Sequence, residues 1–214
     1  MAKMELKKGL YQIHQEDYDR IWFTSDTHFG HKNILKYCPD SRPFGEDVDA
    51  HDDTIIENWN SVVGKDDIVF HLGDFSFYKD NEKVRSIIGR LNGKIYLCLG
   101  NHDTHNYNIY KELFEDVQYQ YVLYAGHLNA TVYLNHYPYL CYPGNLPVFS
   151  PNVSVWQLFG HVHSNKSSRE NSIDELRLMS KMTDSQYDVG CDNNNLKPVS
   201  FGFIKDILKN EYKE

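Results

Sequence analysis

The sequence predicts a single α/β domain that takes in residues 1–214. Three observations favour this fold class. The chain is long enough for one well-buried core and shows no internal repeat, low-complexity tract or linker. Short apolar runs of strand type alternate with segments whose apolar residues have helical spacing. Five of the expected strands run into Asp, Asn, His or Gly, and ligands bind at the carboxyl ends of strands in open α/β sheets.

The first half of the chain alternates strands with a helix. Residues 20–25 are an apolar run that leads into polar Asp26, which predicts a strand. Residues 48–63 place their apolar side chains on one side of a helix, and Gly64 closes it. A second apolar run over 67–72 predicts the next strand.

The second half begins with a helix over 81–91, which the turn signal Asn92-Gly93 ends. Ser is a preferred N-cap residue, so Ser200 is expected to begin a closing helix that contains Phe201 and Ile204. The strands expected between them lie over 94–99, over 117–124 and 128–134 on either side of Gly126, and over 155–159.

Composition and charge narrow the class of protein. A content of 41% hydrophobic and 24% charged residues is typical of a soluble globule. No apolar run approaches the length of a membrane span, and residues 1–20 lack the apolar core of a signal peptide, so we expect a cytoplasmic protein without a membrane partner. The net charge of −8, without a Lys/Arg-rich stripe, argues against long nucleic acid and for a small substrate.

The cysteines predict neither a disulfide framework nor a zinc–thiolate site. Cys38, Cys98, Cys141 and Cys191 are widely spaced and form no CxxC pair. Cys98 lies in an apolar run, where a buried thiol acts as a small hydrophobic side chain. Free thiols fit a reducing compartment.

Candidate metal ligands recur after the predicted strands. Each motif is weak alone, because a lone histidine is more often structural than a ligand. The ordered set within one domain is specific. In chain order it consists of Asp26-x-His28, Gly73-Asp74, Gly100-Asn101-His102-Asp103, His136 and Gly160-His161-x-His163.

This ordered set resembles the calcineurin-like metallophosphoesterase superfamily, over about residues 21–207. Further stretches over 26–34, 189–192 and 197–201 are similar to a bacterial and phage subgroup of small, single-domain members. The resemblance implies a four-layer αββα sandwich of two mixed β-sheets flanked by helices, with metals at the strand ends.

Two neighbouring cations need several hard or borderline ligands and one carboxylate that can bridge them. The resemblance implies that Asp74 bridges the two. Nitrogen and oxygen ligands without thiolate suit Mn, Fe, Zn, Ni or Co and disfavour Ca, and the sequence does not choose among them. The implied ligands are Asp26, His28 and His163 for the first cation, and Asn101, His136 and His161 for the second.

The implied reaction is direct attack on phosphorus by water activated between the cations. His102 is the expected general acid for the leaving group, with Asp103 as its orienting partner, and a structural donor is the alternative for His102. His31 and Asn33 are expected to face the metals and contact the phosphate, with exposed loop residues as the alternative. Arg42 is a candidate for reaching the substrate, with an ordinary loop cation as the alternative.

Other aromatic and histidine residues have weaker signals. His71 lies inside an apolar strand and is expected to be buried and hydrogen-bonded. The tyrosine-rich stretch 133–142 predicts core and rim packing, with a base-stacking platform as the alternative.

The expected substrate is a small or accessible phosphodiester, because no appended domain or long cap stands out. A phosphomonoesterase is the alternative. A scaffold that has lost the chemistry would lack ligands, whereas all seven and His102 are present. A nuclease acting on long DNA is a further alternative, and the acidic net charge counts against it. Oligomeric state and physiological substrate are open.

Overall fold

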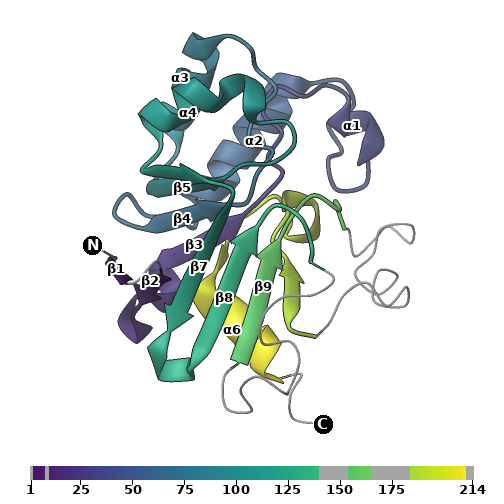
Figure 1. The fold of residues 1–214 in the computed structure, drawn as a ribbon. Coiled ribbons are helices and arrows are strands. Elements are labelled where there is room, and N and C mark those ends of the chain that lie inside the picture. The colour runs from purple at the N-terminus through teal and green to yellow at the C-terminus, as the bar shows by residue number, and fades with distance from the viewer. Residues whose placement is uncertain (1, 8–9, 140–153, 165–183, 211–214) are drawn as a thin grey trace.

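Two mixed β-sheets pack face to face in the computed structural model, which describes residues 2–7, 10–139, 154–164 and 184–210 (Figure 1). The first sheet has the spatial order β1 (Met4–Lys7), β2 (Leu10–Ile13), β7 (Gln120–Ala125), β8 (Ala130–Asn135), β9 (Ser154–Phe159) and β10 (Gln186–Asp188). The second has the order β11 (Val199–Ser200), β3 (Ile21–Thr24), β4 (Ile68–His71), β5 (Lys94–Cys98) and β6 (Asp116–Gln118).

Strands β3, β4, β5 and β6 are parallel, and β11 runs antiparallel to β3. In the first sheet β8, β9 and β10 are parallel to one another. The carboxyl ends of parallel neighbours meet at one edge of a sheet, so the residues that follow β3, β4 and β5 are brought together there, and those after β8 and β9 likewise.

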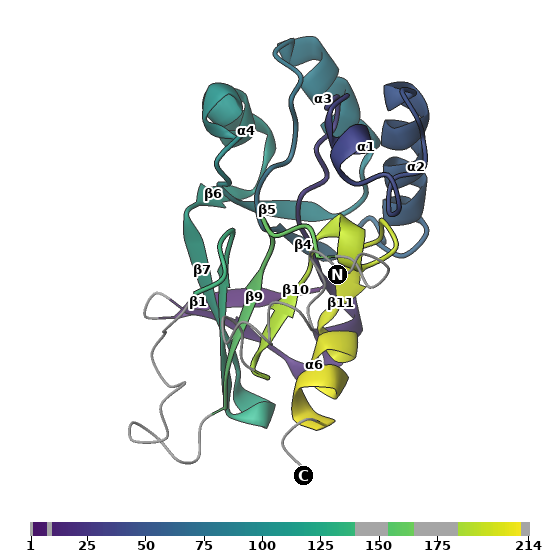
Figure 2. The same ribbon diagram turned by 90° about the vertical axis from the view of Figure 1, so that its right-hand side faces the viewer.

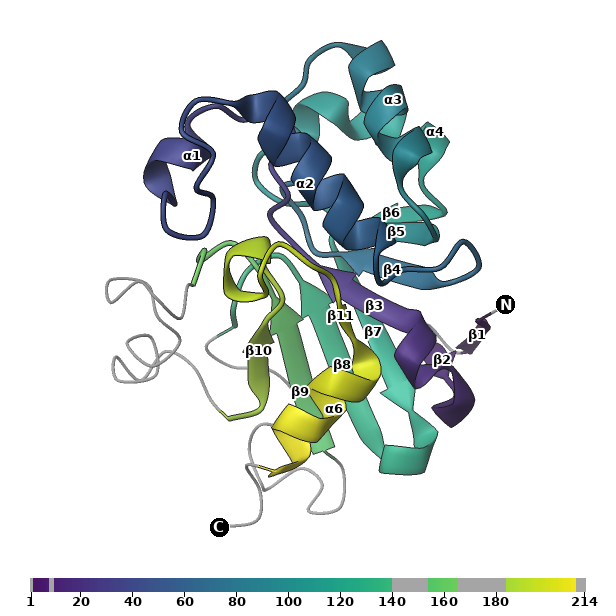
Figure 3. The same ribbon diagram turned by 180° about the vertical axis from the view of Figure 1, so that it is seen from behind.

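The helices lie around this sandwich. Figures 2 and 3 show α2, α3 and α4 together over the second sheet and α6 beside β11. The bounds are α1 (Ile34–Tyr37), α2 (Val48–Asn60), α3 (Asn81–Arg90), α4 (Tyr107–Leu113) and α6 (Phe201–Asn210). None of the helices in the described ranges is long and apolar enough to cross a membrane.

The alternating direction of side chains along the strands produces two apolar cores. Successive side chains of a strand point to opposite faces, so Phe70 enters the core between the sheets while Val69 enters the core beneath the helices. Helix α6 supplies Phe201 and Ile204 to the inter-sheet core, and Trp59 of α2 belongs to the other. The expected pair of mixed sheets flanked by helices is confirmed.

Most predicted elements are confirmed within a few residues of their expected ends. Ser200 caps the closing helix as expected, since its Oγ accepts a hydrogen bond from the Phe203 amide at 3.2 Å. The single strand predicted over 117–124 is wrong: β6 ends at Gln118, exposed Tyr119 follows, and β7 begins at Gln120 in the other sheet. Strands β1 and β2 were not predicted, because charged and polar residues interrupt their apolar pattern.

Candidate metal centre

All seven predicted ligands follow strands in the structure. Their side chains are joined by a continuous chain of short distances, so the fold gathers them at one place. They are Asp26 and His28 after β3, Asp74 after β4, Asn101 after β5, His136 after β8, and His161 and His163 after β9.

The backbone of five of these residues lies in the left-handed region, which turns the chain sharply at the strand end. Non-glycine residues seldom adopt it, and Asp and His tolerate it better than most, at about 1 kcal/mol or more each. The strand ends are thus shaped to aim these side chains, at a cost in local backbone energy. The φ angles are 57° at Asp26, 50° at His28, 56° at Asp74, 71° at His161 and 47° at His163.

A first group of ligands centres on Asp26. Its Oδ1 lies 3.8 Å from Nε2 of His28 and 3.9 Å from Nε2 of His163. The other carboxylate oxygen, Oδ2, accepts a hydrogen bond from the His161 amide at 2.9 Å. One oxygen of Asp26 is therefore fixed by the backbone, and the other faces the two imidazoles.

A second group surrounds His136. Its Nδ1 donates to the Leu72 carbonyl oxygen at 2.8 Å, which leaves Nε2 unprotonated toward the site in the neutral ring. Nε2 lies 3.0 Å from Oδ1 of Asn101 and 3.2 Å from Nδ1 of His161. His136 is buried and His161 is exposed, so this group opens to solvent on one side.

Asp74 lies between the two groups. Its Oδ2 is 3.7 Å from Nε2 of His28 and 3.5 Å from Nε2 of His136. Its Oδ1 accepts a hydrogen bond from the His102 amide at 2.9 Å. The carboxylate is therefore oriented by the backbone with one oxygen directed between the groups.

The residues present fit divalent cations. Two ligand atoms, each about 2.0–2.2 Å from a common ion, are separated by roughly 3–4 Å, as these are. Among the described residues, Oδ1 of Asp26 and Nε2 of His28 are buried polar atoms without a hydrogen-bond partner. Unpaired buried polar atoms are rare in native proteins, and a cation would satisfy both.

Comparison with known proteins identifies the family. The family model for calcineurin-like phosphoesterases matches residues 19–198. The chain belongs to the calcineurin-like phosphoesterase family. An uncharacterized protein of Methanocaldococcus jannaschii is 32% identical over 191 residues, which cover 89% of this chain and 92% of the relative.

Two further relatives agree with this assignment. The gene 66 protein of Mycobacterium phage L5 is 37% identical over 137 residues, which cover 56% of this chain and 63% of the phage protein. The crystal structure of a protein of unknown function from Aquifex aeolicus is similar with a TM-score of 0.63 and 27% identity, covering 87% of this chain and 98% of that one.

Members of this phosphoesterase family normally bind divalent metals, and the two ligand groups described above are candidates to hold them here.

Burial favours the neutral, ligating form of two histidines in this phosphoesterase. It lowers the pKa of His28 well below 6.5, and the neighbouring His163 and Arg42 lower it further. Burial also lowers the pKa of His161, with His136 adding to the effect. A neutral imidazole is the form that binds metals, so these two sites need not lose a proton first.

His163 is held by a residue outside the predicted set. Its Nδ1 lies 2.7 Å from Oδ2 of Asp192. Burial alone lowers the pKa of His163, but hydrogen bonds to Asp192 and Cys38 and the charge of Asp26 outweigh it and raise the pKa to about 11. Asp192 thus fixes the ring so that Nε2 faces Asp26. The described group Cys38, His163 and Asp192 also has metal-ligand spacing, but it shares this hydrogen bond and belongs to the same site.

The substrate contact expected of Arg42 is contradicted by its position. Arg42 is fully buried and pairs with Asp192 through two hydrogen bonds, Nε to Oδ1 at 2.9 Å and Nη2 to Oδ2 at 2.8 Å. It also donates to the carbonyl oxygens of Asp26 and Thr27. Arg42 therefore positions the loop that carries the first ligands. The sequence signal that could have pointed to its partner Asp192 was the stretch Val189-Gly190-Cys191-Asp192.

The orienting role expected of Asp103 is also wrong. Its carboxylate is fully buried and accepts backbone amides of Asp74 at 2.8 Å, Phe75 at 2.9 Å and Gly100 at 2.8 Å. Within the described ranges no hydrogen bond joins it to His102. Asp103 instead ties the loop after β4 to the loop after β5, so it positions Asp74.

His102 stands at the edge of the centre. Its side chain is 45% exposed, with Nε2 4.0 Å from Oδ2 of Asp74. The ring of Phe77 lies 4.7 Å from it. His102 is thus near the Asp74 carboxylate and open to solvent.

His31 and Asn33 differ in their distance from the ligands. His31 stacks on Phe77 with 3.6 Å between ring centroids, and its Nδ1 lies 3.2 Å from Nδ1 of His28. Burial, with the charges of His102 and Arg42, lowers the pKa of His31 to about 4. Asn33 is exposed at the start of α1, and its side chain makes no capping hydrogen bond. Their expected phosphate contacts stay predictions.

Tyr137, in the tyrosine-rich stretch 133–142, packs against the candidate site although it was not predicted as a site residue. Its ring lies 4.9 Å from that of His136 and 4.7 Å from that of His161, and its hydroxyl donates to Oδ1 of Asn101 at 3.5 Å. It therefore packs against all three ligands of the second group. The rest of the predicted tyrosine-rich stretch is described only to Tyr139, and residues 140–142 lie outside the described residues.

Proposed function

We propose that this chain is a phosphoesterase whose centre takes two divalent cations bridged by Asp74. The proposal is carried by the position of Asp74 Oδ2, 3.7 Å from Nε2 of His28 and 3.5 Å from Nε2 of His136. An oxygen in that position is able to serve a cation on either side. The nitrogen and oxygen donors suit Mn, Fe, Zn, Ni or Co.

The protein's own groups divide the remaining work. When bound, two such cations acidify water at neutral pH and neutralise charge on the phosphate oxygens. Asp103 and Asp192 hold Asp74 and His163 in ligating positions. In this proposal half-exposed His102, 4.0 Å from Asp74, gives a proton to the departing oxygen.

A small or accessible phosphodiester is the proposed substrate. At neutral pH a diester carries one negative charge and a monoester close to two, so a monoester needs more positive charge around it. The guanidinium of Arg42 is already neutralised by Asp192. Within the described residues no other Lys or Arg side chain forms a hydrogen bond or ion pair with the seven ligands, which supports the less charged substrate.

The test is a pair of rates with metal-reconstituted protein. We expect faster hydrolysis of bis-p-nitrophenyl phosphate than of p-nitrophenyl phosphate, with each of the five candidate metals tried in turn. The reverse order would assign a phosphomonoesterase. Failure to hydrolyse either ester, with both ions bound, would favour a scaffold. Asp74→Asn protein prepared in the same way controls for contaminating phosphatases.

A further inference from the structure

A buried histidine that is not among the seven ligands lies next to Arg42. His51 is fully buried near the start of α2, and its Nε2 lies 2.9 Å from Nη1 of Arg42. Its other ring nitrogen, Nδ1, lies 2.9 Å from Oδ1 of Asp52, which is also buried. Both nitrogens of the ring are thus bonded within the protein.

The guanidinium of Arg42 decides the direction of both hydrogen bonds. Arginine has N–H donors and no acceptor, so Nε2 of His51 must be the acceptor and carries no proton. Burial lowers the pKa of His51 below its ordinary value, and the charge of Arg42 adds to this, although the hydrogen bond to Asp52 opposes it. The ring is therefore neutral, with its proton on Nδ1 and donated to Asp52.

The other N–H groups of Arg42 reach the surroundings of the first ligand group. Two donate to the carboxylate of Asp192, and one each to the carbonyl oxygens of Asp26 and Thr27. Because the donors of a guanidinium form a rigid planar fork, an acceptor on one side sets the plane for all of them. His51 therefore fixes the plane in which Arg42 meets Asp192.

Asp52 holds the same loop at a second point. Its Oδ2 accepts a hydrogen bond from the Gly30 amide at 3.0 Å and one from the Tyr78 hydroxyl at 2.9 Å. Gly30 has a φ of 77°, and a Cβ there would meet the Tyr78 ring at 2.8 Å, so the turn needs glycine. Asp52 thus fixes the chain two residues after His28.

The loop between these two points has a backbone that needs support from outside. Asp26 and His28 both adopt left-handed conformations, with φ angles of 57° and 50°. Such conformations persist only where surrounding contacts fix them. The hydrogen bonds from Arg42 and Asp52, one on each side of His28, are contacts of that kind.

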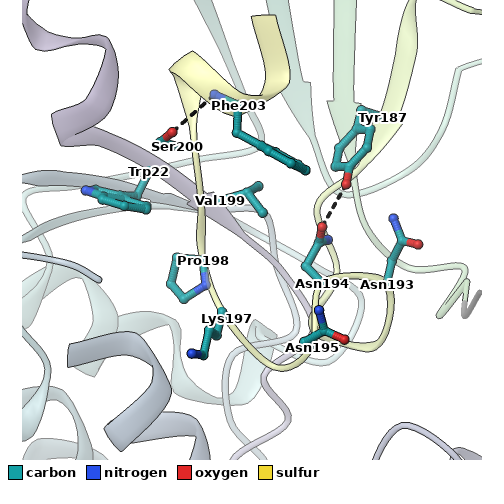
Figure 4. Close-up of a pocket in the computed structure, with 10 residues that line it drawn as sticks. All are labelled: Trp22, Tyr187, Asn193, Asn194, Asn195, Lys197, Pro198, Val199, Ser200 and Phe203. Atoms are coloured by element: carbon teal, nitrogen blue, oxygen red, sulfur yellow. Dashed lines mark hydrogen bonds between the residues drawn. The ribbon is translucent and has the colours of Figure 1, made fainter. Parts of the chain in front are cut away.

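The turn that carries Asp192 is anchored independently of α2. Asp192 belongs to the short 3-10 helix η4 (Cys191–Asn193), and Asn194 directly after it accepts a hydrogen bond from the Tyr187 hydroxyl at 2.8 Å (Figure 4). The side-chain amide of Asn194 also donates to the Gly190 carbonyl oxygen at 2.9 Å. The guanidinium therefore joins two separately anchored parts, the turn after β10 and the start of α2.

We propose that His51 and Asp52 are positioning residues for the first ligand group. His51 orients the guanidinium that holds Asp192 against His163. Asp52 fixes the turn that follows the first two ligands. The inference rests on the proposed function, because this group is the one that would hold the first cation.

The tautomer of His51 is a readout that needs neither metal nor a variant. A long-range ¹H–¹⁵N spectrum of the metal-free chain at neutral pH should show His51 with a protonated Nδ1 and an unprotonated Nε2. Nuclear Overhauser contacts to Phe44 assign the ring, since the two ring centroids are 5.5 Å apart. A protonated Nε2 would overturn the inference, because Arg42 could not then donate to it.

Two substitutions of equal size test the acceptor. His51→Gln supplies an oxygen that can accept from Arg42, whereas His51→Met fills the same space without it. In competition with a chromophoric chelator, His51→Met should bind one of the two ions about tenfold or more weakly. His51→Gln should bind both ions nearly as tightly as the parent. A purely structural role would instead lower stability in both variants without separating their metal affinities.

Asp52→Asn tests the second point of contact and should also weaken binding of one ion about tenfold or more. Asp53→Asn is the matched control, because it makes the same change at the next position of α2, where the side chain is 56% exposed. It should leave the affinity for both ions unchanged.

The outcomes separate this inference from the proposed function. Equal losses in His51→Met and His51→Gln, or parent-like affinity in both His51→Met and Asp52→Asn, would overturn the inference while the parent still binds two ions. A parent that binds no divalent cation would overturn the proposed function and this inference together. If His51→Met does not fold, the tautomer in the parent and the affinity of Asp52→Asn still decide.

Discussion

Asp192 lies 2.7 Å from His163, with its Oδ2 against Nδ1 of the imidazole. A carboxylate behind a metal-binding histidine fixes the orientation of the ring and raises its basicity. Asp192→Asn should therefore weaken metal binding at the first ligand group about 10–100-fold, as measured by competition with a chromophoric chelator. The effect should be confined to one of the two ions.

The control for Asp192→Asn is the same substitution in a second ion pair of Arg and Asp. Asp67 pairs with Arg20 at 2.9 Å, far from the metal ligands. Asp67→Asn should lower stability without changing the affinity for metal. Unchanged affinity in Asp192→Asn would mean that His163 needs no partner to ligate.

Asp74→Asn tests the bridge. An amide bridges two cations poorly and neutralises none of their charge, so the variant should bind fewer ions than the parent and lose nearly all turnover. Elemental analysis of the reconstituted protein should give two ions per parent chain. A single ion in the parent, or retained turnover in the variant, would contradict the dinuclear proposal.

His102→Ala tests the general acid. Loss of the proton donor should slow esters with poor alkoxide leaving groups by about a hundred- to ten-thousand-fold, and should barely affect nitrophenyl esters. Both ions should stay bound. His105→Ala, at an exposed position nearby, is the control. A uniform loss across leaving groups would assign His102 to charge stabilisation instead.

Gly160→Ala tests how tightly the first group is packed. A Cβ at this position would overlap Oγ of Ser25 and Oδ2 of Asp26, so the variant should displace Asp26 and lose metal from the first group. Gly89→Ala is the matched control in α3, where a Cβ meets nothing within 4 Å. It should stabilise the fold by about 0.5–1 kcal/mol in urea unfolding and leave the metal content unchanged.

The burial of His71 should make the free energy of unfolding depend on pH. It is buried as expected, with Nε2 3.0 Å from Oγ1 of Thr27, and burial lowers its pKa to about 3. The unfolded chain takes up a proton below about pH 6.5 while the folded chain does not, so its contribution is present above that pH and is lost as the pH falls toward 3.

The measurement is urea unfolding of parent and His71→Gln at about pH 7.5 and about pH 5. Between these values the parent should lose about 2 kcal/mol more than the variant, because 1.5 pH units of linkage are removed with the imidazole. Equal losses would show that His71 is protonated in the folded protein or neutral in the unfolded one.

The gathering of the seven candidate ligands was predictable because each lies next to a strand end. Asp26 and His28 follow an apolar run directly, and the same pattern recurs at Asn101. The residues that keep these side chains in position were not predictable, because only the fold brings them together. Arg42 and Asp192 are 150 positions apart, and neither lies in a ligand motif.

Two predictions that relied on neighbouring positions in the sequence were wrong, and at both places the chain changes direction. Asp103 follows His102, but its side chain is buried against backbone amides while the side chain of His102 is 45% exposed. The apolar pattern over 117–124 is continuous, whereas the strands separate at Tyr119 and enter different sheets. Neither the side-chain direction of Asp103 nor the break between the strands alters the spacing of apolar residues in the sequence.

If the proposed cations bind, the five left-handed residues of the candidate centre link the lifetime of the folded protein to metal supply. Their backbone energy is present with or without a phosphoester, and a bound cation would offset it. Metal-starved chains should therefore unfold first and be preferentially degraded, so that a cell short of the cofactor retains fewer inactive copies. Protease resistance should rise steeply as metal is restored, before any substrate is added.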